Sequence, residues 1–349
     1  MTNPLLSAPY VEDILYQPKA LRETLAAMAR SGGKNLSGFA QSLRSGRLRR
    51  IVLTGMGSSY HGLHPLYLTL IEQGFHVQWM ETSELIHHAP SLIMPDTLVV
   101  AVSQSGSSAE IVRLLERTGN EVPVIGVTNT QDSPLASGAT EAFLTFAGPE
   151  HSVSCKTYVT ALVILTVIGE VLKGGNLEPV LSKLQMLPEA VAHYLASLES
   201  NVDVLIQRLE GVKYLVLVGR GRSLAATGAG SLIIKEAARF PAEGMSCAAF
   251  RHGPMEMASP EVYVLVYEGT GQTSALNAGL VADIQKAGGR SVLVGPGSGD
   301  DVFRIPPVSV EGLPVLEILP AQMLSLALAL QQGHAPGQFV NASKVTSSE

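Results

Sequence analysis

The chain contains an internal repeat. Val52–Ser59 (VLTGMGSS) matches Val216–Ser223 (VLVGRGRS) after an interval of 164 residues. Ser103–Ser108 and Glu268–Thr273 each follow an apolar run, and the interval between these two loops is 165 residues. One interval that recurs across separate motifs indicates two copies of one domain. A length of 349 residues also favours two domains.

Short apolar runs alternate with helical patterns. The runs expected to be strands are 51–54, 77–80, 98–102, 124–127 and 142–146, with a comparable run at 292–295 in the second copy. Helices are expected at 11–29, 60–73 and 109–117. This alternation is typical of βαβ units and predicts an α/β fold with a parallel sheet in each half.

Composition narrows the class of protein. The formal net charge is −6, whereas nucleic-acid binders usually carry a basic surface, so no nucleic-acid partner is expected. The two cysteines, Cys155 and Cys247, cannot build a disulfide framework or a thiolate metal site. The N-terminus lacks a signal-peptide pattern, and the apolar run 157–169 is too short to span a bilayer. We therefore expect a cytoplasmic protein with no membrane partner.

Hydroxyl side chains gather after two of the expected strands. Ser58 and Ser59 follow the first strand, and Ser103–Ser108 follows the third and precedes a helix. Backbone N–H groups and hydroxyls at a helix start converge on anions, aided by the helix dipole. A single serine there would be read as an ordinary helix N-cap. Two such loops together favour binding of a terminal phosphomonoester.

The glycine turn also admits a dinucleotide-binding interpretation. Gly55-x-Gly57 follows a strand, and Glu81 lies 24 residues beyond Gly57, where a ribose-binding acid is expected. The third glycine position holds Tyr60, whose bulk opposes close packing of helix on strand. A nicotinamide site is therefore the weaker interpretation.

These motifs resemble a known family. Gly57-Ser58-Ser59 followed by Ser103-Gln104-Ser105-Gly106-Ser107-Ser108 is similar to the first half of a tandem sugar isomerase (SIS) protein, and most similar to the isomerase module of glucosamine-6-phosphate synthases. Further matching strings are Gln17-Pro18, Glu150–Lys156, Gly219-Arg220-Gly221, Lys235-Glu236, Arg251-His252-Gly253-Pro254 and Asn341-Ala342-Ser343-Lys344. The resemblance implies two flavodoxin-like, three-layer αβα domains with parallel sheets, arranged as an internal repeat.

The resemblance also implies site residues. Phosphate binding falls to Gly57, Ser58, Ser59, Ser103, Gln104, Ser105 and Ser108, and sugar binding to Val153 and Ser154. His252 would assist ring opening, Glu236 would move a proton between C1 and C2, and Lys344 would neutralise charge on the sugar. The implied partner is a sugar 6-phosphate, the implied assembly is a homodimer with shared active sites, and no cofactor or metal is implied.

The chain departs from the family pattern at several positions. Ile233 stands where the pattern has a lysine before the catalytic glutamate, and Ala249 stands where it has a glutamate before the histidine. The loop 150–156 is about one residue shorter than the pattern, so the places of Val153 and Ser154 are approximate. Met1-Thr2 leads directly into the sugar-phosphate module. That start favours release of ammonia or an amino acid over synthesis from glutamine.

The residues alone leave alternatives open. Glu236 lies on an apolar helical stretch, where desolvation would raise its pKa and suit it to acid–base catalysis; the alternative is a surface ion pair with Lys235. His252 can exchange protons in its loop or serve as a hydrogen-bonded core histidine. His61 and His64 have helical spacing but no evident third metal ligand, so they are expected on a helix surface or in a substrate pocket.

The expected organisation has five parts. These are an N-terminal helical segment (1–44), a first SIS domain (45–177), a helical linker (178–209), a second SIS domain (210–332) and a tail that closes the active site (333–349). The expected function is isomerase or deaminase chemistry on an amino-sugar or fructosamine 6-phosphate. A fructosamine-6-phosphate deglycase, a non-catalytic sugar-phosphate sensor and a nicotinamide-dependent oxidoreductase are the alternatives.

Overall fold

The computed structural model describes residues 8–31, 35–341, 343, 344 and 346. The chain forms two compact units, which we name by their sheets. The five-stranded unit comprises Lys19–Glu150, Lys156–Gln185 and Ser343–Glu349, and the four-stranded unit comprises Met1–Pro18, His151–Cys155 and Met186–Ala342. The short segment 151–155 therefore belongs with residues far away in sequence.

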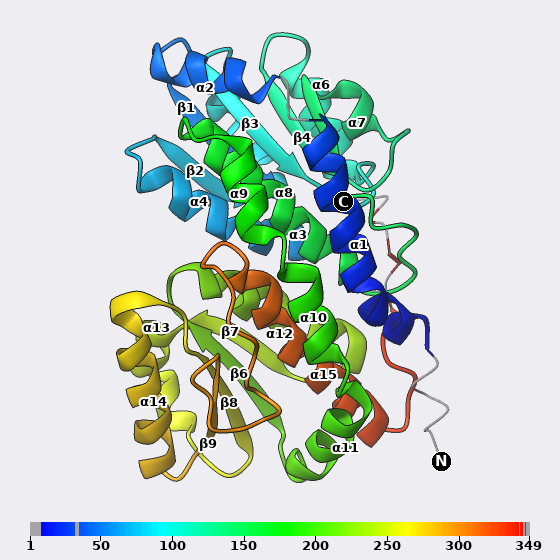
Figure 1. The fold of residues 1–349 in the computed structure, drawn as a ribbon, viewed down its shortest axis with the longest axis vertical. Helices are drawn as coiled ribbons and strands as arrows, with labels where there is room; N and C mark the ends of the chain where they lie inside the picture. Colours follow the sequence, from blue (N-terminus) through cyan, green and yellow to red (C-terminus); the bar gives the residue numbers. More distant parts are fainter. Residues whose placement is uncertain (1–7, 32–34, 342, 345, 347–349) are drawn as a thin grey trace. The chain divides into compact units, whose positions relative to one another are not determined.

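The five-stranded unit is built on a parallel sheet (Figure 1). Its strands are β1 (Arg50–Gly55), β2 (Val77–Glu81), β3 (Thr97–Val102), β4 (Val124–Thr128) and β5 (Glu141–Leu144). Their order is β2-β1-β3-β4-β5, the flavodoxin-like order in which the strand sequence reverses beside β1. In register, Leu53 of β1 lies between Trp79 and Val100. All six residues of β3 are buried, as expected of a central parallel strand.

Helices cover both faces of this sheet. One face packs against α5 (Thr82–His87), α6 (Ala109–Thr118) and α7 (Pro134–Gly138), around a core that includes Val99 and Leu114. The other face packs against α3 (Gly57–Gly62), α4 (His64–Ile71) and α8 (Lys156–Leu172). The unit also contains α2 (Leu36–Arg44), the short 3₁₀ helix η2 (Pro90–Leu92), α9 (Leu177–Leu184) and the second half of α1 (Pro9–Ser31).

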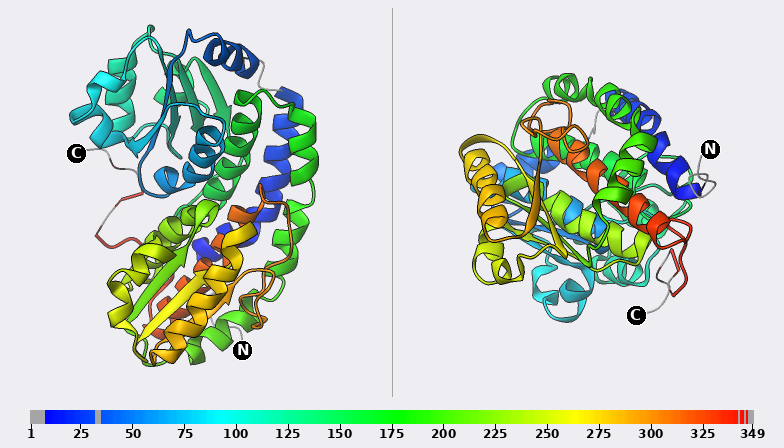
Figure 2. Two further views of the ribbon diagram at one scale, coloured as in Figure 1. Left: turned by 90° about the vertical axis from the view of Figure 1, so that its left-hand side faces the viewer. Right: turned by 90° about the horizontal axis from the view of Figure 1, so that it is seen from below.

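The four-stranded unit has the same three layers (Figure 2). Its parallel strands are β6 (Tyr214–Gly219), β7 (Ala242–Ser246), β8 (Val262–Tyr267) and β9 (Arg290–Val294), in the order β7-β6-β8-β9. One face packs on α13 (Cys247–Arg251) and α14 (Ser274–Lys286), and the other on α12 (Leu224–Ala238) and α15 (Leu313–Gln331). The remaining elements are α10 (Leu187–Leu195), α11 (Leu198–Arg208), η3 (Gly221–Ser223), η4 (Pro254–Met257) and η5 (Gly271–Thr273). The first four strands of the two sheets share one order, which supports the proposed repeat.

Two expected elements differ from the structure. The helix expected at 60–73 begins three residues earlier, at Gly57, and is interrupted at Leu63, where α3 ends and α4 begins. The strand expected at 142–146 ends at Leu144. Phe146 has a φ of 50°, which lies outside the β region and ends the strand's pairing. The other strands and helices expected in the first copy are confirmed within a few residues.

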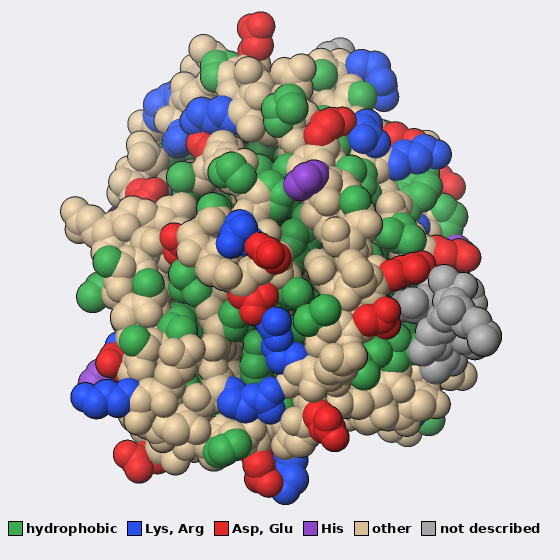
Figure 3. Space-filling model, turned by 60° about the horizontal axis from the view of Figure 1, so that its bottom comes forward, with side chains coloured by type: hydrophobic (Ala, Val, Ile, Leu, Met, Phe, Trp, Pro, Cys, Tyr) green, Lys and Arg blue, Asp and Glu red, His purple; other side chains and the backbone are tan. Residues whose placement is uncertain are grey.

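The long apolar helix α15 lies in the protein core. Among the described residues, α15 alone is long and apolar enough to cross a membrane, and 94% of that stretch is buried inside the protein. Such burial is typical of a core helix. On the face seen in Figure 3, acidic and basic side chains are interspersed, in keeping with the small net charge of −6.

Candidate functional site

Two turns at the carboxyl ends of β1 and β3 have the expected backbone. Gly57 (φ 53°) begins α3, and Gly106 (φ 64°) turns the Ser103–Ser108 loop. A Cβ at Gly106 would lie 2.3 Å from the Ser133 hydroxyl, so glycine is required there by space as well as by φ. Ligands of open α/β sheets bind at this edge, beyond the carboxyl ends of the strands.

The hydroxyls of the Ser103–Ser108 loop differ in their partners. Ser103 Oγ accepts a hydrogen bond from the Gly106 N–H (3.2 Å), and Ser105 Oγ accepts one from the Ser107 N–H (3.3 Å). Ser108 is the N-cap of α6, but its side chain makes no capping hydrogen bond. Ser58 is buried, and Ser59, Gln104 and Ser108 are half-buried. Ser108 therefore occupies the N-cap position without the side-chain hydrogen bond of a capping serine.

Tyr60 fills the third glycine position of the dinucleotide pattern. Its ring stacks on Trp79 at 4.4 Å between centroids. Burial, together with the Glu81 carboxylate, raises the pKa of Tyr60. Trp79 Nε1 donates to the Tyr60 carbonyl (3.0 Å), so the aromatic pair occupies the space that a glycine leaves open in a dinucleotide fold.

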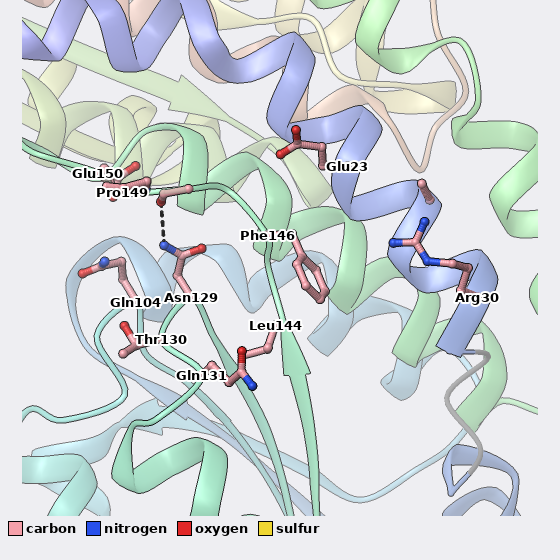
Figure 4. Close-up of a pocket in the computed structure, with 12 residues that line it drawn as sticks. Glu23, Arg30, Gln104, Asn129, Thr130, Gln131, Leu144, Phe146, Pro149 and Glu150 are labelled. Atoms are coloured by element: carbon pink, nitrogen blue, oxygen red, sulfur yellow. Dashed lines mark hydrogen bonds between the residues drawn. The ribbon is translucent and has the colours of Figure 1, made fainter.

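A cavity of about 810 Å³ adjoins the Ser103–Ser108 loop (Figure 4). It shares Gln104 with that loop and lies entirely within the five-stranded unit. Its lining residues are Glu23, Ala26, Arg30, Gln104, Asn129, Thr130, Gln131, Leu144, Phe146, Gly148, Pro149 and Glu150.

Glu150 and Lys344 meet beside this cavity. The Glu150 side chain is fully buried and accepts hydrogen bonds from the Thr157 N–H (3.0 Å) and Thr157 Oγ1 (2.6 Å) at the start of α8. Lys344 Nζ donates to the Glu150 carbonyl and lies 3.5 Å from Glu150 Oε2. Two residues later, the Thr346 carbonyl accepts a hydrogen bond from the Ala109 N–H at the start of α6 (3.2 Å). The tail thus lies against the predicted phosphate loop; Ala342 of the predicted tail motif is outside the described residues.

Glu236 and the 151–155 segment are linked through Gly337 in the four-stranded unit. The Gly337 N–H donates to the carbonyl of Ala237, next to Glu236, and Ser152 Oγ donates to the Gly337 carbonyl (2.6 Å). Gly337 has a φ of 74°, and a Cβ there would lie 2.2 Å from Ser152 Oγ. Glu236 is half-buried on α12. This link joins the helix that carries Glu236 to the segment that carries Val153 and Ser154.

Ser154 and His252 are accessible, and Val153 is not. Val153 is buried with 1% exposure, and Ser154 is half-buried. His252 is exposed and follows α13, with its N–H donating to the Ala249 carbonyl (3.0 Å). The alternative of a core histidine is therefore wrong for His252. Ile233, the first departure from the family pattern, is fully buried on α12.

The equivalent turns in the second copy carry a carboxylate. Glu268 stands at the position of Ser103, and its carboxylate accepts a hydrogen bond from the Gly297 N–H (2.7 Å). Asn277 Nδ2 donates to the Glu268 carbonyl, and Asn277 Oδ1 accepts from Arg220 Nε (3.0 Å). A carboxylate repels phosphate, and the Glu268 carboxylate also accepts the hydrogen bond that the Gly297 N–H could otherwise give to an anion. The second copy therefore lacks the hydroxyl-rich turn that the Ser103–Ser108 loop gives the first copy.

Glu317 on α15 is a buried acid that the sequence motifs did not indicate. It is 0% exposed, and its Oε1 accepts a hydrogen bond from Ser223 Oγ (2.7 Å). Burial raises the pKa of Glu317 to about 8. The hydrogen bond from Ser223 lowers this pKa, and the negative charge of Glu268 raises it further. A single acid within an otherwise apolar helix was the available signal for this residue.

The histidine pair after the first turn does not form a metal site in the described part of the chain. No group of three potential His, Cys, Asp or Glu ligands occurs there. His64 is 6% exposed and lies edge-on to Trp79 at 4.9 Å between centroids. The expectation of a surface or pocket position is wrong for His64, which packs in the core; His61 is half-buried.

The predicted site residues fall into two groups. The five-stranded unit contains Gly57, Ser58, Ser59, Ser103, Gln104, Ser105, Ser108 and Lys344. The four-stranded unit contains Val153, Ser154, Glu236 and His252. Sequence reasoning missed the contact of Glu150 with Lys344 and the cavity walls formed by Glu23, Arg30 and Phe146.

Comparison with known proteins shows what this chain is similar to. Residues 47–170 match the family model of the SIS domain. The chain is 29% identical over 97% of its length to a glutamine–fructose-6-phosphate aminotransferase (isomerizing) of Pyrococcus horikoshii, but spans only 57% of that protein.

Solved structures share the fold. The C-terminal domain of glucosamine-fructose-6-phosphate aminotransferase from Francisella tularensis superposes with a TM-score of 0.83 at 19% identity, covering 95% of this chain and 98% of that one. A glucosamine-6-phosphate deaminase from Thermotoga maritima superposes with a TM-score of 0.75 at 18% identity, covering 98% and 100%. Residues 47–170 thus match the SIS domain model, and nearly the whole chain is similar to a little more than half of a glutamine–fructose-6-phosphate aminotransferase (isomerizing).

Proposed function

We propose that this protein acts on an amino-sugar or fructosamine 6-phosphate by moving a proton between C1 and C2 of the open-chain sugar. The observation that carries the proposal is the Ser103–Ser108 loop, which precedes α6. The Ser108 hydroxyl makes no capping hydrogen bond there, and the same unit contains the contact between Lys344 and Glu150. The name of the Pyrococcus relative, an isomerizing fructose-6-phosphate aminotransferase, supports the same substrate class.

Phosphate recognition is assigned to the five-stranded unit. The α6 N-terminus supplies backbone N–H groups and the positive end of a helix dipole. Ser59, Ser103, Gln104, Ser105 and Ser108 supply hydroxyls and an amide. In the structure the Ala109 N–H is occupied by the Thr346 carbonyl, so a phosphate at this place exchanges with that tail contact.

Proton transfer is assigned to the four-stranded unit. His252 assists opening of the sugar ring, since its exposed imidazole is accessible to a substrate. Glu236 then removes a proton from one carbon and returns it to the neighbouring carbon, as a positioned carboxylate does in general acid–base catalysis. Lys344 stabilises negative charge on the open-chain sugar. This chemistry requires no metal and no organic cofactor.

A screen of ligands tests the substrate class. Thermal unfolding is measured with hexose and hexosamine 6-phosphates, each beside its unphosphorylated form. Ligands that bind the folded state raise the melting temperature, and we expect the phosphorylated forms alone to do so. Incorporation of solvent deuterium at C1 or C2 then tests turnover. Equal shifts with and without the phosphate would contradict the proposal.

Binding without deuterium incorporation would instead support a non-catalytic sugar-phosphate sensor. Tight binding of NADH would support the oxidoreductase alternative, against which the Tyr60–Trp79 stack already argues.

We further propose a cytoplasmic homodimer with shared active sites. If one site draws on both subunits, mixing Glu236→Gln with His252→Ala subunits restores part of the activity, because some sites receive both native residues. Mixtures that stay as inactive as each variant alone would argue for sites built within one subunit.

A further inference from the structure

A second cavity lies at the opposite edge of the five-stranded sheet from the Ser103–Ser108 loop. Its volume is about 380 Å³, and its lining residues come from two segments of the five-stranded unit, 43–51 and 74–76. Because β1 and β2 begin at this cavity, we call it the amino-edge pocket. The six residues of β1 separate it from the Gly57 turn by roughly 16 Å along the strand. The pocket is therefore separate from the candidate site described above.

One side of the amino-edge pocket is the end of α4, which is closed by hydrogen bonds. Gly74 has a φ of 79°, and its N–H donates to the Ile71 carbonyl (2.9 Å). The Phe75 N–H donates to the Leu70 carbonyl (3.3 Å), which completes a Schellman motif. The backbone that presents Phe75 to the pocket is therefore held in place before any ligand binds.

The other side is the end of α2, which is closed in a similar way. Gly46 has a φ of 73°, and its N–H donates to the Leu43 carbonyl (3.2 Å). The Leu48 N–H donates to the Ser42 carbonyl (3.0 Å). A helix C-terminus attracts cations through its unpaired carbonyls, but here N–H groups of the chain itself bond to carbonyls at the ends of both helices. These carbonyls are therefore already used, which argues against a cationic ligand.

The polar side chains that line the pocket are basic. They are Arg49, Arg50 and His76, and the described residues of the lining include no aspartate or glutamate. Arg50 lies 3.4 Å from Asp96 Oδ2 in a partly exposed ion pair, which is a weak interaction. Arg49 and His76 are exposed, and neither side chain has a hydrogen bond or an ion pair within the described part of the chain. Both are therefore available to an anion.

The remaining side chains of the pocket are apolar. Leu43, Leu48 and Ile51 are buried, and Phe75 is half-buried. Small-molecule sites typically combine such apolar walls with a few polar groups that fix the orientation of the ligand. An aromatic ring beside aliphatic side chains favours a flat apolar group, because its contact with the walls removes apolar surface from water.

We propose that the amino-edge pocket binds a small phosphomonoester whose organic part is flat and apolar. Arg49 donates two parallel N–H groups to the phosphate oxygens, and His76 donates to a further oxygen. The organic part packs against Phe75 and Leu48. The volume of about 380 Å³ is near the lower end of the range of roughly 300–1,000 Å³ for small-molecule sites, which limits the ligand to a small one. Because the pocket is remote from the residues assigned to proton transfer, such a ligand acts as an effector and not as a reactant.

Calorimetry with phenyl phosphate and inorganic phosphate tests the assignment. The protein is the full chain carrying Ser103→Ala and Ser105→Ala, so that the predicted phosphate loop contributes as little as possible to the signal. We expect both probes to bind, and phenyl phosphate to bind about tenfold more tightly because its ring leaves water. Phenol, which has the ring without the phosphate, should bind far more weakly than phenyl phosphate.

Variants in the same background locate the binding. Arg49→Met should weaken binding of both phosphates by about tenfold, since it removes the guanidinium and keeps an unbranched stem. Gly74→Asp should weaken binding through charge repulsion, while Gly74→Asn, of the same size, should change it little. Both variants are expected to fold, because no described atom lies within 4 Å of a Cβ at Gly74 and these two residue types tolerate its positive φ. Arg117→Met, at the exposed end of α6, is the control for loss of a positive charge.

The outcomes separate cleanly. Weaker binding in Arg49→Met and Gly74→Asp, with normal binding in Gly74→Asn and Arg117→Met, supports the amino-edge pocket as the site. No saturable binding of phenyl phosphate, or equal affinity in all four variants, overturns the assignment. The proposed reaction is tested by turnover of sugar 6-phosphates in the wild type, so its failure is distinguishable from failure of this pocket.

Discussion

Lys344 Nζ lies 3.5 Å from Glu150 Oε2, although the two residues are 194 positions apart in the chain. The lysine is mostly buried and the carboxylate is completely so. Glu150 is in turn held by two hydrogen bonds from Thr157 at the start of α8. A lysine near the end of the chain is thereby placed against the start of α8 in the five-stranded unit.

Removing the tail lysine should abolish most activity. Lys344→Met deletes the charge with little change in bulk, and we expect kcat to fall by roughly 10²–10³, the usual effect of losing one group that stabilises developing charge. Truncation after Gln338 should do the same without unfolding the protein, because Gly337 and its link from Ala237 to Ser152 remain.

Truncation after Thr346 is the matched control, since it keeps Lys344 and the contact with Ala109. Steady-state kinetics and the melting temperature are measured for each variant. Limited proteolysis adds an independent readout, in which sugar phosphate protects the tail from cleavage. Full turnover after truncation at Gln338 would remove Lys344 from the site.

The Ser103–Ser108 loop should control affinity for the phosphate. Ser103→Ala with Ser105→Ala should weaken binding of a 6-phosphate by about 2–4 kcal/mol, from the loss of about two charge-assisted hydrogen bonds. Ser107→Ala is the control, because Ser107 is exposed in the same loop. Calorimetry measures both, and an unchanged affinity in the double variant would place the phosphate elsewhere.

Glu236→Gln should separate binding from chemistry. The amide keeps the size and shape of the side chain but cannot remove a proton, so we expect turnover to fall by roughly 10²–10⁴ while ligand binding survives. Deuterium incorporation at C1 or C2 is the direct readout. Exchange at the wild-type rate in the variant would show that another group moves the proton.

Stability should depend on pH through Glu317. Its pKa is raised by burial from about 4.5 to about 8, so the folded state favours the protonated acid. The unfolded chain ionises near 4.5 and the folded chain only near 8, so stability is highest at low pH and declines as pH rises between these values. Above pH 8 this contribution no longer changes.

Glu317→Gln should flatten that decline. The amide stays neutral and still accepts the hydrogen bond from Ser223 Oγ. The melting temperatures at pH 5 and at pH 8 should therefore differ less in the variant than in the wild type. The corresponding change in the free energy of unfolding is on the order of a few kcal/mol. Glu261→Gln, at an exposed position, is the control. Parallel profiles for wild type and Glu317→Gln would mean that Glu317 titrates normally in the fold.

Local patterns in the sequence determined much of the fold. The apolar run 98–102 was predicted to be a strand, and the structure buries every residue of β3, as expected of a central parallel strand. The turn at Gly106 and the helix start at Ser108 follow from residue types whose preferences act over a few positions. The alternation of strands and helices predicted parallel sheets, while their strand order is seen only in the structure.

The tertiary structure alone decided which distant residues meet. Phe146, with its left-handed φ, lies between Thr145 and Ala147, which both donate hydrogen bonds to Asn129 Oδ1. Segment 151–155 is bonded through Ser152 to Gly337, which lies more than 180 residues beyond it. His64 was expected on a helix surface or in a substrate pocket, because helical spacing does not reveal that His64 packs against Trp79. These contacts join residues far apart in sequence, and their energy depends on three-dimensional packing that no local pattern of residue types encodes. The sequence by itself therefore determined the strands, the turns and the hydroxyl-rich Ser103–Ser108 loop, while packing decided the cavity, the Lys344–Glu150 contact and the raised pKa of Glu317.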